Sequence, residues 1–225
     1  MIISNLKGKI IVSSQAMPNE PFYDEKCMQA MFESVIKGGA GGLRVAGARD
    51  VRNALKYNVP VIGLTKPDKL PENWKSIVYI TPTIETVREL IKAEANIIAF
   101  DGTSRIRPDG SSLKEIIDLI HSKEKLAMAD IATFDEGINC ANLGADIIST
   151  TLSGYTEESD KGLKFPDFEL LKLLVKSIDK PVFLEGRIWT PEDVKKGFDL
   201  GAHSVVIGSA ITRPHLITKR FIEGL

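Results

Sequence analysis

The stretch "VFLEGRIWTPEDVKKGFDLGAHSVVIG", residues 182–208, has the pattern of one strand–helix–strand unit. Its two ends are short apolar runs, typical of strands that are buried on both faces. Between them, Thr190 before Pro191 fits a helix N-cap followed by proline, and Gly201 follows the helical pattern as a C-terminal cap does. The stretch therefore predicts two parallel strands joined by a helix.

The same alternation runs through the rest of the chain. Capping boxes at Ser112 with Glu115 and at Thr133 with Glu136 begin two helices, and Gly144 ends one. Further apolar runs bring the number of predicted strands to eight, at 10–14, 42–46, 61–65, 97–100, 126–130, 147–151, 182–185 and 204–208. Eight such units close a barrel, so we predict an α/β fold, a single (β/α)8 TIM barrel domain over residues 1–225.

A ninth apolar run, "IVYI" at 77–80, does not fit this count. Too few residues separate it from the third strand for a helical crossover, and two of them are Pro67 and Pro71. We therefore place it in an elaborated loop after the third strand. The stretch 154–167 is predicted to be a second long loop.

Composition excludes several classes of partner. The formal net charge is −1 and the cations are spread along the chain, so nothing favours nucleic acid or a membrane surface. The N-terminal residues lack a signal-peptide layout and no run approaches a membrane span, so we expect a cytoplasmic protein. Cys27 and Cys140 lie in helical patterns and are expected to be core thiols. The oligomeric state stays open, with a homodimer as one option.

Polar residues end nearly all of the predicted strands. In a barrel the catalytic groups stand at the C-terminal strand ends. Taken singly, each has a structural explanation, such as a salt bridge for Arg44 or a helix cap for Asp130. Their convergence on one mouth favours a site made of Gln15, Arg44, Lys66, Asp101, Asp130, Thr150, Thr151, Glu185, Gly208 and Ser209.

The segments that follow the last two predicted strands indicate a phosphate-binding site. Barrels often bind phosphate at the loops after strands seven and eight, through backbone N–H groups. The candidates come from "EGRI" (185–188) and "IGSAITRP" (207–214), and Arg213 could add a charge-assisted bond. Alternatively, the glycines serve only tight turns. The phosphate reading gives substrate-binding roles to Gly186, Arg187, Gly208, Ser209 and Arg213.

Neither a metal nor an organic cofactor is expected. His121, His203 and His215 are placed away from the mouth, and no Gly-rich dinucleotide fingerprint follows the first strand. The chemistry then falls to Lys, Glu, Asp and Arg side chains.

Seven motifs together resemble the bacterial N-acetylmannosamine-6-phosphate 2-epimerases of sialic acid catabolism. They stand in family order and spacing over nearly the whole chain: "IVSSQA", "GGLRV", "PVIGLTK", "ADIAT", "STTLSGYT", "LEGRIWTP" and "IGSAITRPHLITKRF". The resemblance implies cofactor-independent interconversion of N-acetylmannosamine 6-phosphate and N-acetylglucosamine 6-phosphate. It implies proton transfer by Lys66 and Glu185, and substrate binding by Gln15, Arg44 and Asp130. The segment 66–80 departs from the family in its length.

The chemistry suits a lysine and a glutamate. In the open form of the sugar the C2 proton is acidic because its removal gives an enolate, and epimerisation returns a proton to the other face. Two carriers on opposite sides achieve this, provided that the pKa of Lys66 is lowered and that of Glu185 raised. Direct pairing would do the reverse, so we expect desolvation, the nearby Arg44 and the bound substrate to set the two pKa values.

Two rival functions stay open. A lysine at a barrel strand end also serves Schiff-base aldolases, which would make the protein a lyase acting on a sugar phosphate. From a different class, the chain could be a non-catalytic sugar-phosphate binder or a subunit of a synthase complex.

Overall fold

Eight parallel strands form a closed barrel in the computed structural model, which describes residues 2–224. Neighbours in the sequence are neighbours in the sheet, and β8 pairs with β1 to complete the ring. The strands are β1 (Lys9–Ser14), β2 (Gly42–Ala46), β3 (Val61–Leu64), β4 (Ile97–Asp101), β5 (Leu126–Asp130), β6 (Ile147–Ser149), β7 (Val182–Glu185) and β8 (Ser204–Ile207). The predicted (β/α)8 fold class is confirmed. Residues 1 and 225, the ends of the predicted domain, lie outside the described part.

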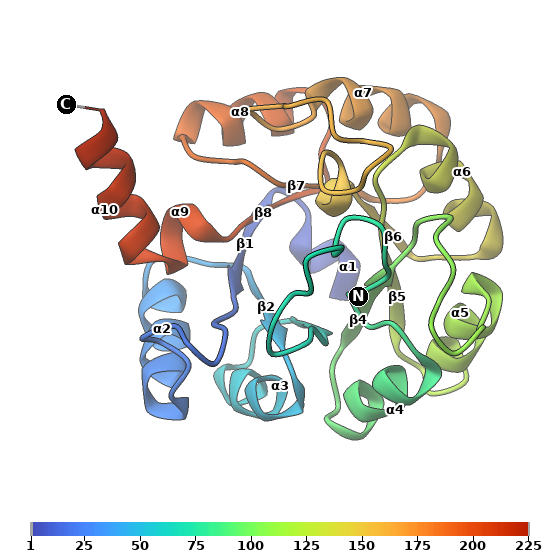
Figure 1. Ribbon diagram of the computed structural model, residues 1–225, viewed down its shortest axis with the longest axis horizontal. Helices are drawn as coiled ribbons and strands as arrows, with labels where there is room; N and C mark the ends of the chain where they lie inside the picture. Colours follow the sequence, from blue (N-terminus) through green and yellow to red (C-terminus); the bar gives the residue numbers. More distant parts are fainter. Residues whose placement is uncertain (1, 225) are drawn as a thin grey trace.

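Helices surround this ring on its outer side (Figure 1). They are α2 (Glu25–Lys37), α3 (Ala48–Ala54), α4 (Ile84–Lys92), α5 (Leu113–His121), α6 (Phe134–Leu143), α7 (Phe168–Ser177) and α8 (Pro191–Asp199), with short 3₁₀ turns η1 (Leu55–Tyr57) and η2 (Thr150–Leu152). The predicted N-caps Ser112, Thr133 and Thr190 each accept a hydrogen bond from the third helical amide. Gly144 ends α6 with φ of 104°.

The core has two parts because strand side chains alternate between the two faces. Outward residues such as Val45, Phe100 and Leu184 pack against the helices. Inward residues such as Ile62, Met128 and Phe183 fill the barrel. A short helix not foreseen from the sequence, α1 (Ile2–Leu6), packs its fully buried Leu6 on this inner cluster.

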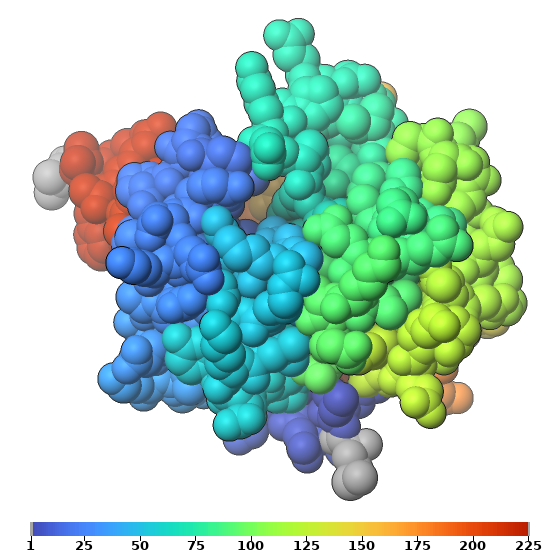
Figure 2. All heavy atoms as spheres, turned by 90° about the horizontal axis from the view of Figure 1, so that it is seen from below, coloured from blue at the N-terminus to red at the C-terminus, as the bar shows by residue number. Residues whose placement is uncertain are grey.

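The segment between β3 and α4 forms an irregular loop, as predicted for "IVYI", and contains no strand. Its end inserts between two strands: the Thr81 amide donates to the Thr65 carbonyl (3.0 Å) and the Asp101 amide donates to the Ile80 carbonyl (3.1 Å). In Figure 1 the loop crosses the mouth of the ring, and in Figure 2 the same teal segment projects beyond the helices. The loop thereby helps to shape the mouth and places Tyr79 in it.

The chain after β8 departs from the regular pattern. It forms α9 (Ser209–Thr212) and then α10 (Pro214–Glu223), which stands away from the ring in Figure 1. The side chains of Phe221 and Ile222 on α10 are 74% and 65% exposed. None of the helices within residues 2–224 combines the length and the apolar character that a membrane crossing requires.

The two cysteines differ in their surroundings. Cys140 is fully buried, as expected of a core thiol. Cys27 is only half-buried, so the expectation of a core position was wrong for this residue, which lies in the first turn of α2 near its exposed N-terminus. Within residues 2–224 no cluster of His, Cys, Asp and Glu is arranged to hold a metal ion.

Candidate active site

A cavity of about 300 Å³ opens at the C-terminal ends of the strands. Of the ten residues predicted to be catalytic or to bind substrate, eight line it: Gln15, Lys66, Glu185, Gly186, Arg187, Gly208, Ser209 and Arg213. The other two, Arg44 and Asp130, lie beneath its floor with 1% and 0% of their surface exposed. The strand-end residue Thr151 also lines the cavity, whereas Asp101 pairs with Arg105 and Thr150 bonds the backbone of Glu185, both outside the cavity lining. Most of the strand-end residues therefore converge on one place, in two layers.

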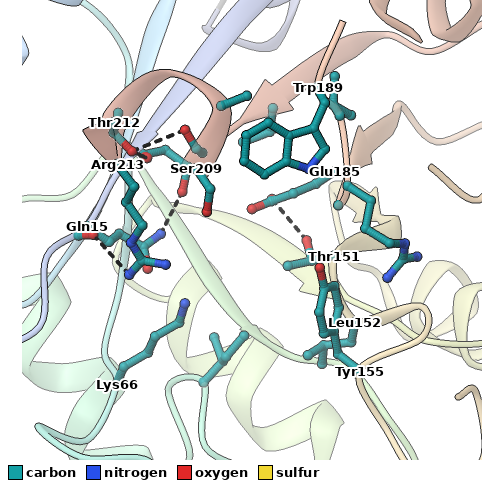
Figure 3. A pocket seen from close by; sticks show the side chains of 18 of the residues that line it. Gln15, Lys66, Thr151, Leu152, Tyr155, Glu185, Trp189, Ser209, Thr212 and Arg213 are labelled. Carbon is teal, nitrogen blue, oxygen red and sulfur yellow. Dashed lines mark hydrogen bonds between the residues drawn. The ribbon is translucent and has the colours of Figure 1, made fainter. Parts of the chain in front are cut away.

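Lys66 and Glu185 face each other across this cavity. They follow or end β3 and β7, which are opposite strands of an eight-stranded ring. Figure 3 shows both side chains directed into the same space from opposite sides. No hydrogen bond or ion pair joins them in the described part of the chain, so there is room between them for a substrate atom.

The surroundings of Lys66 favour its neutral form. Burial and the positive charge of Arg44 together lower the pKa of Lys66 to about 8, although the carboxylate of Glu185 acts in the opposite direction. A lysine in water has a pKa of about 10.4 and is almost wholly protonated at pH 7.5. Here a sizeable fraction is neutral at that pH.

The glutamate is shifted in the opposite direction. Burial raises the pKa of Glu185, and Asp130 raises it as well, whereas Arg44 and Lys66 lower it. Desolvation is the largest cause for both groups, because each charged form loses water inside the barrel. These opposite shifts agree with the pattern that the sequence argument requires of an acid–base pair.

Beneath the cavity, Arg44 and Asp130 form a buried ion pair. The two guanidinium nitrogens Nη1 and Nη2 of Arg44 lie 3.1 Å and 2.6 Å from the two carboxylate oxygens of Asp130. The remaining Nε has no hydrogen-bond acceptor but lies 3.4 Å from Oε2 of Glu185. Arg44 therefore presents an uncommitted N–H toward the catalytic candidate.

Thr151 connects the two carboxyl groups. Its hydroxyl lies 2.7 Å from Oδ1 of Asp130 and 3.0 Å from Oε2 of Glu185. A hydroxyl has one proton and two acceptor positions, so it can donate to only one of them. The hydrogen bond from Thr151 to Glu185 lowers the pKa of that carboxyl group and so opposes the effect of burial.

The residues predicted to bind phosphate line the cavity after the ends of β7 and β8. Gly186 has φ of 107°, a backbone conformation that residues with a side chain rarely adopt. Ser209 is the first residue of α9, and the first amides of that helix have no hydrogen-bond partner inside it. The Nε of Arg213 lies 3.2 Å from Glu20, which holds the guanidinium at the edge of the cavity.

Arg187 is placed differently from the other cations. Its Nε donates to the Phe165 carbonyl (3.0 Å) and its Nη2 to the Ser153 carbonyl (2.8 Å). The guanidinium also stacks on the ring of Tyr155 at 4.9 Å. These contacts hold the predicted long loop 154–167 against the barrel, so the guanidinium of Arg187 is engaged by protein.

Several cavity residues had no assigned role at the sequence level. They include Ser13, Tyr79, Ile80, Leu152, Tyr155 and Trp189. Tyr79 belongs to the run "IVYI", whose apolar character signalled burial but not direction. Thr151 was recognised as a strand-end residue without a function.

Comparisons with known proteins agree on one family. The family model described as "Putative N-acetylmannosamine-6-phosphate epimerase" matches residues 28–225. A relative named as such a 2-epimerase from Clostridium perfringens is 47% identical over 98% of both chains, and one from Clostridioides difficile is 44% identical over 100% of this chain and 99% of its own. The solved N-acetylmannosamine-6-phosphate 2-epimerase from Clostridium perfringens matches with a TM-score of 0.94 at 46% identity, covering 100% of this chain and 96% of that one.

Proposed function

The chain belongs to the N-acetylmannosamine-6-phosphate epimerase family, and from this premise we propose that it interconverts N-acetylmannosamine 6-phosphate and N-acetylglucosamine 6-phosphate in sialic acid catabolism. The reaction is an isomerisation at C2 of a phosphorylated amino sugar. It needs one proton removed from C2 and one returned to the opposite face, with no net change in oxidation state.

Lys66 and Glu185 carry these protons. With the open-chain sugar between them, one side chain takes the C2 proton and the electron pair moves onto the C1 oxygen as an enolate. The other side chain then protonates C2 from its own side. The single observation that supports this best is that the two groups face one cavity from opposite strands. They form no ion pair with each other in the described part of the chain, and their pKa values are shifted in opposite directions.

Arg44, Asp130 and Gln15 support the reacting pair. Arg44 and Asp130 lie under the cavity, so we assign them to setting the charge around Glu185 and Lys66 and to closing the floor on which the sugar rests. Gln15 lines the cavity and its amide donates to Ser13 Oγ (2.8 Å), which orients its carbonyl oxygen as an acceptor. That oxygen is buried without a donor and is available to a sugar hydroxyl.

The phosphate binds at the β7 and β8 ends. Backbone N–H groups at Gly186, Gly208 and Ser209 would meet its oxygens, and Arg213 would add charge. The backbone of Arg187 continues this turn while its side chain holds the neighbouring loop. Binding at this end uses a part of the substrate remote from C2 to position the reacting centre.

One experiment tests the proposal directly. Purified protein is incubated with N-acetylmannosamine 6-phosphate in deuterated water, and C2 is followed by proton NMR. We expect N-acetylglucosamine 6-phosphate to appear with deuterium at C2. Formation of the second epimer with full retention of the C2 hydrogen would exclude the two-carrier mechanism, and no conversion would exclude the function.

The Schiff-base aldolase remains the second candidate, because a lysine with a pKa of about 8 is also a good nucleophile. Borohydride reduction in the presence of the sugar phosphate separates the two. A covalent adduct on Lys66 with cleavage of a carbon–carbon bond supports the aldolase, whereas conversion without an adduct supports the epimerase.

We also propose that the protein acts in the cytoplasm as a homodimer. The support for self-association is α10, whose Phe221 and Ile222 are exposed on a helix that stands away from the barrel. Sedimentation equilibrium of the intact chain and of the double variant Phe221→Ser and Ile222→Ser measures this, with loss of the dimer expected in the variant.

A further inference from the structure

Tyr79 is a buried phenol at the candidate site for which the reaction described above gives no role. Its ring is 8% exposed and lines the same cavity as Lys66 and Glu185. Trp74 holds it edge to face, with ring centroids 5.9 Å apart and planes at 86°. Among residues 2–224 no protein group forms a hydrogen bond with its hydroxyl, which leaves that O–H for a molecule in the cavity.

The backbone that carries Tyr79 is fixed from both sides. Thr81 donates its amide to Thr65 and its hydroxyl to the Ala99 carbonyl (2.6 Å), and it has φ of 44°, which non-glycine residues seldom adopt. Arg105 holds the preceding turn by donating to the Lys75 carbonyl (2.9 Å) while it pairs with Asp101 (2.6 Å). The phenol is thus preorganised, as a group that stabilises a transition state must be.

The position of Tyr79 identifies the part of the substrate that it meets. It lies between the ends of β3 and β4, because the backbone around it bonds to Thr65 and Asp101. In an eight-stranded ring β4 is opposite β8, where we place the phosphate. A sugar with its phosphate at β8 and its C2 between Lys66 and Glu185 therefore extends its C1 end toward Tyr79.

The C1 oxygen is where negative charge appears. Removing the C2 proton sends the C–H electron pair into a new C1–C2 double bond and moves the carbonyl electrons onto the oxygen. The guanidinium groups nearby face other groups: Arg44 binds Asp130 through its Nη atoms and directs its Nε at Glu185, and Arg213 pairs with Glu20 at the phosphate end. A neutral hydrogen-bond donor at the β4 end would complete the site without adding a charge.

Burial and the charge of Asp101 raise the pKa of Tyr79, so the phenol keeps its proton throughout the working pH range. Unlike Lys66, it is therefore unsuited to remove the C2 proton and well suited to donate a hydrogen bond. Asp130 acts on it in the same direction, and Arg105 opposes this in part.

We propose that Tyr79 is a catalytic residue whose O–H donates a hydrogen bond to the C1 oxygen of the open-chain sugar, most strongly when that oxygen becomes an enolate. The phenol proton stays on Tyr79, and the C2 proton goes to Lys66 or Glu185. This inference rests on the proposed epimerase function and adds the group that stabilises the intermediate.

The first test is Tyr79→Phe, which keeps the ring and its contact with Trp74. Loss of one preorganised donor to an oxyanion lowers kcat by about 10²–10³-fold. We expect that loss with KM changed by less than roughly threefold, because the bond strengthens mainly in the transition state. Exchange of the C2 hydrogen in deuterated water should slow in parallel. The control is Tyr57→Phe outside the barrel, where the lost hydroxyl bonds only the Gln29 carbonyl, and it should keep wild-type kcat.

The second test distinguishes a substrate contact from a structural role by binding alone. Two acyclic inhibitors are compared on wild type and Tyr79→Phe by calorimetry: the C1 carboxylate (2-acetamido-2-deoxy-mannonate 6-phosphate) and the C1 alcohol. We expect the variant to lose about tenfold or more affinity for the carboxylate and much less for the alcohol, because hydrogen bonds to a charged oxygen are the stronger. Equal losses for both inhibitors, or unchanged kcat, would overturn the proposal. A wild-type protein without epimerase activity would instead refute the proposed function.

Discussion

The pH dependence of turnover is the sharpest consequence of the Lys66–Glu185 pair. In the mechanism that we propose, the neutral lysine is the base and the protonated glutamate is the acid in one direction. In the other direction the ammonium is the acid and the carboxylate is the base. Both arrangements hold one proton between them, so the active form is the same singly protonated pair in either direction. We therefore predict a bell-shaped profile of kcat/KM for both epimers.

The structure sets the limbs of this bell. The alkaline limb follows loss of the last proton, near pH 8, because burial and Arg44 lower the pKa of Lys66 to about 8. The acid limb lies above the usual range of a glutamate, because burial raises the pKa of Glu185. At pH 7.5 a lysine with a pKa of about 8 is roughly one-quarter neutral, whereas one with the ordinary value near 10.4 is about one-thousandth neutral. Burial and Arg44 together thus raise the amount of neutral Lys66 about 200-fold.

Two variants and one assay test this reasoning. Initial rates for each epimer are measured by NMR from pH 5 to 10, with wild type, Lys66→Ala and Glu185→Gln. Loss of a positioned acid or base costs about 10²–10⁴-fold, so both variants should fall by at least about 100-fold in kcat. Lys66→Ala should also lose the alkaline limb and Glu185→Gln the acid limb. Near-normal turnover of Lys66→Ala, or an alkaline limb that persists in it, would refute the assignment, and Asp130 would be the next base to examine.

Further predictions concern the stability of the fold and the binding of the phosphate. Lys66→Met should raise the free energy of unfolding at pH 7 by about 1–3 kcal/mol. The pKa of Lys66 is lower in the folded than in the unfolded protein, so protonation of Lys66 destabilises the fold fully below pH 8 and progressively less above it. Urea denaturation should therefore show a smaller gain at pH 10 than at pH 7. Arg44→Ala should lower that free energy by about 3–5 kcal/mol, since it leaves Asp130 buried without its partner, and an unchanged urea midpoint would contradict this. Arg213→Ala should raise KM for the phosphorylated sugar more than it lowers kcat, and a collapse of kcat at unchanged KM would place Arg213 in the chemistry instead. In the wild type, the sugar without its phosphate should show a heavy loss of kcat/KM.

Much of the fold follows from local rules in the sequence. Caps such as Thr190 with Pro191 and short apolar runs separate strands from helices, and spacing alone excluded a ninth strand at 77–80. The short helix α1 escaped prediction because five residues are too few to show a helical period, and its formation depends on burying Leu6 under the barrel.

The strand-end rule located the site but not the depth of its residues. Whether a polar residue at a strand end reaches the cavity or stays below it depends on the stagger of the strands around the ring, which no single strand encodes. Arg44 in the middle of β2 and Asp130 at the end of β5 lie buried beneath the cavity, whereas Lys66, two residues beyond β3, lines it. Arg187 likewise could not be assigned, since its partners are carbonyls of a loop whose path only the fold defines.

The buried Asp130 limits the effect of Arg44 on the pKa of Glu185. Arg44 alone would stabilise an ionised Glu185, because its Nε lies only 3.4 Å from that carboxyl group. By taking both Nη groups of Arg44 and adding its own negative charge nearby, Asp130 offsets part of this effect, and burial, the largest cause, keeps the pKa of Glu185 raised. Arg44 nevertheless remains charged and keeps the pKa of Lys66 low. The buried pair thus lowers the pKa of Lys66 through Arg44, while Asp130 offsets part of the effect of Arg44 on Glu185, which agrees with the proton-transfer roles that we propose for these two residues.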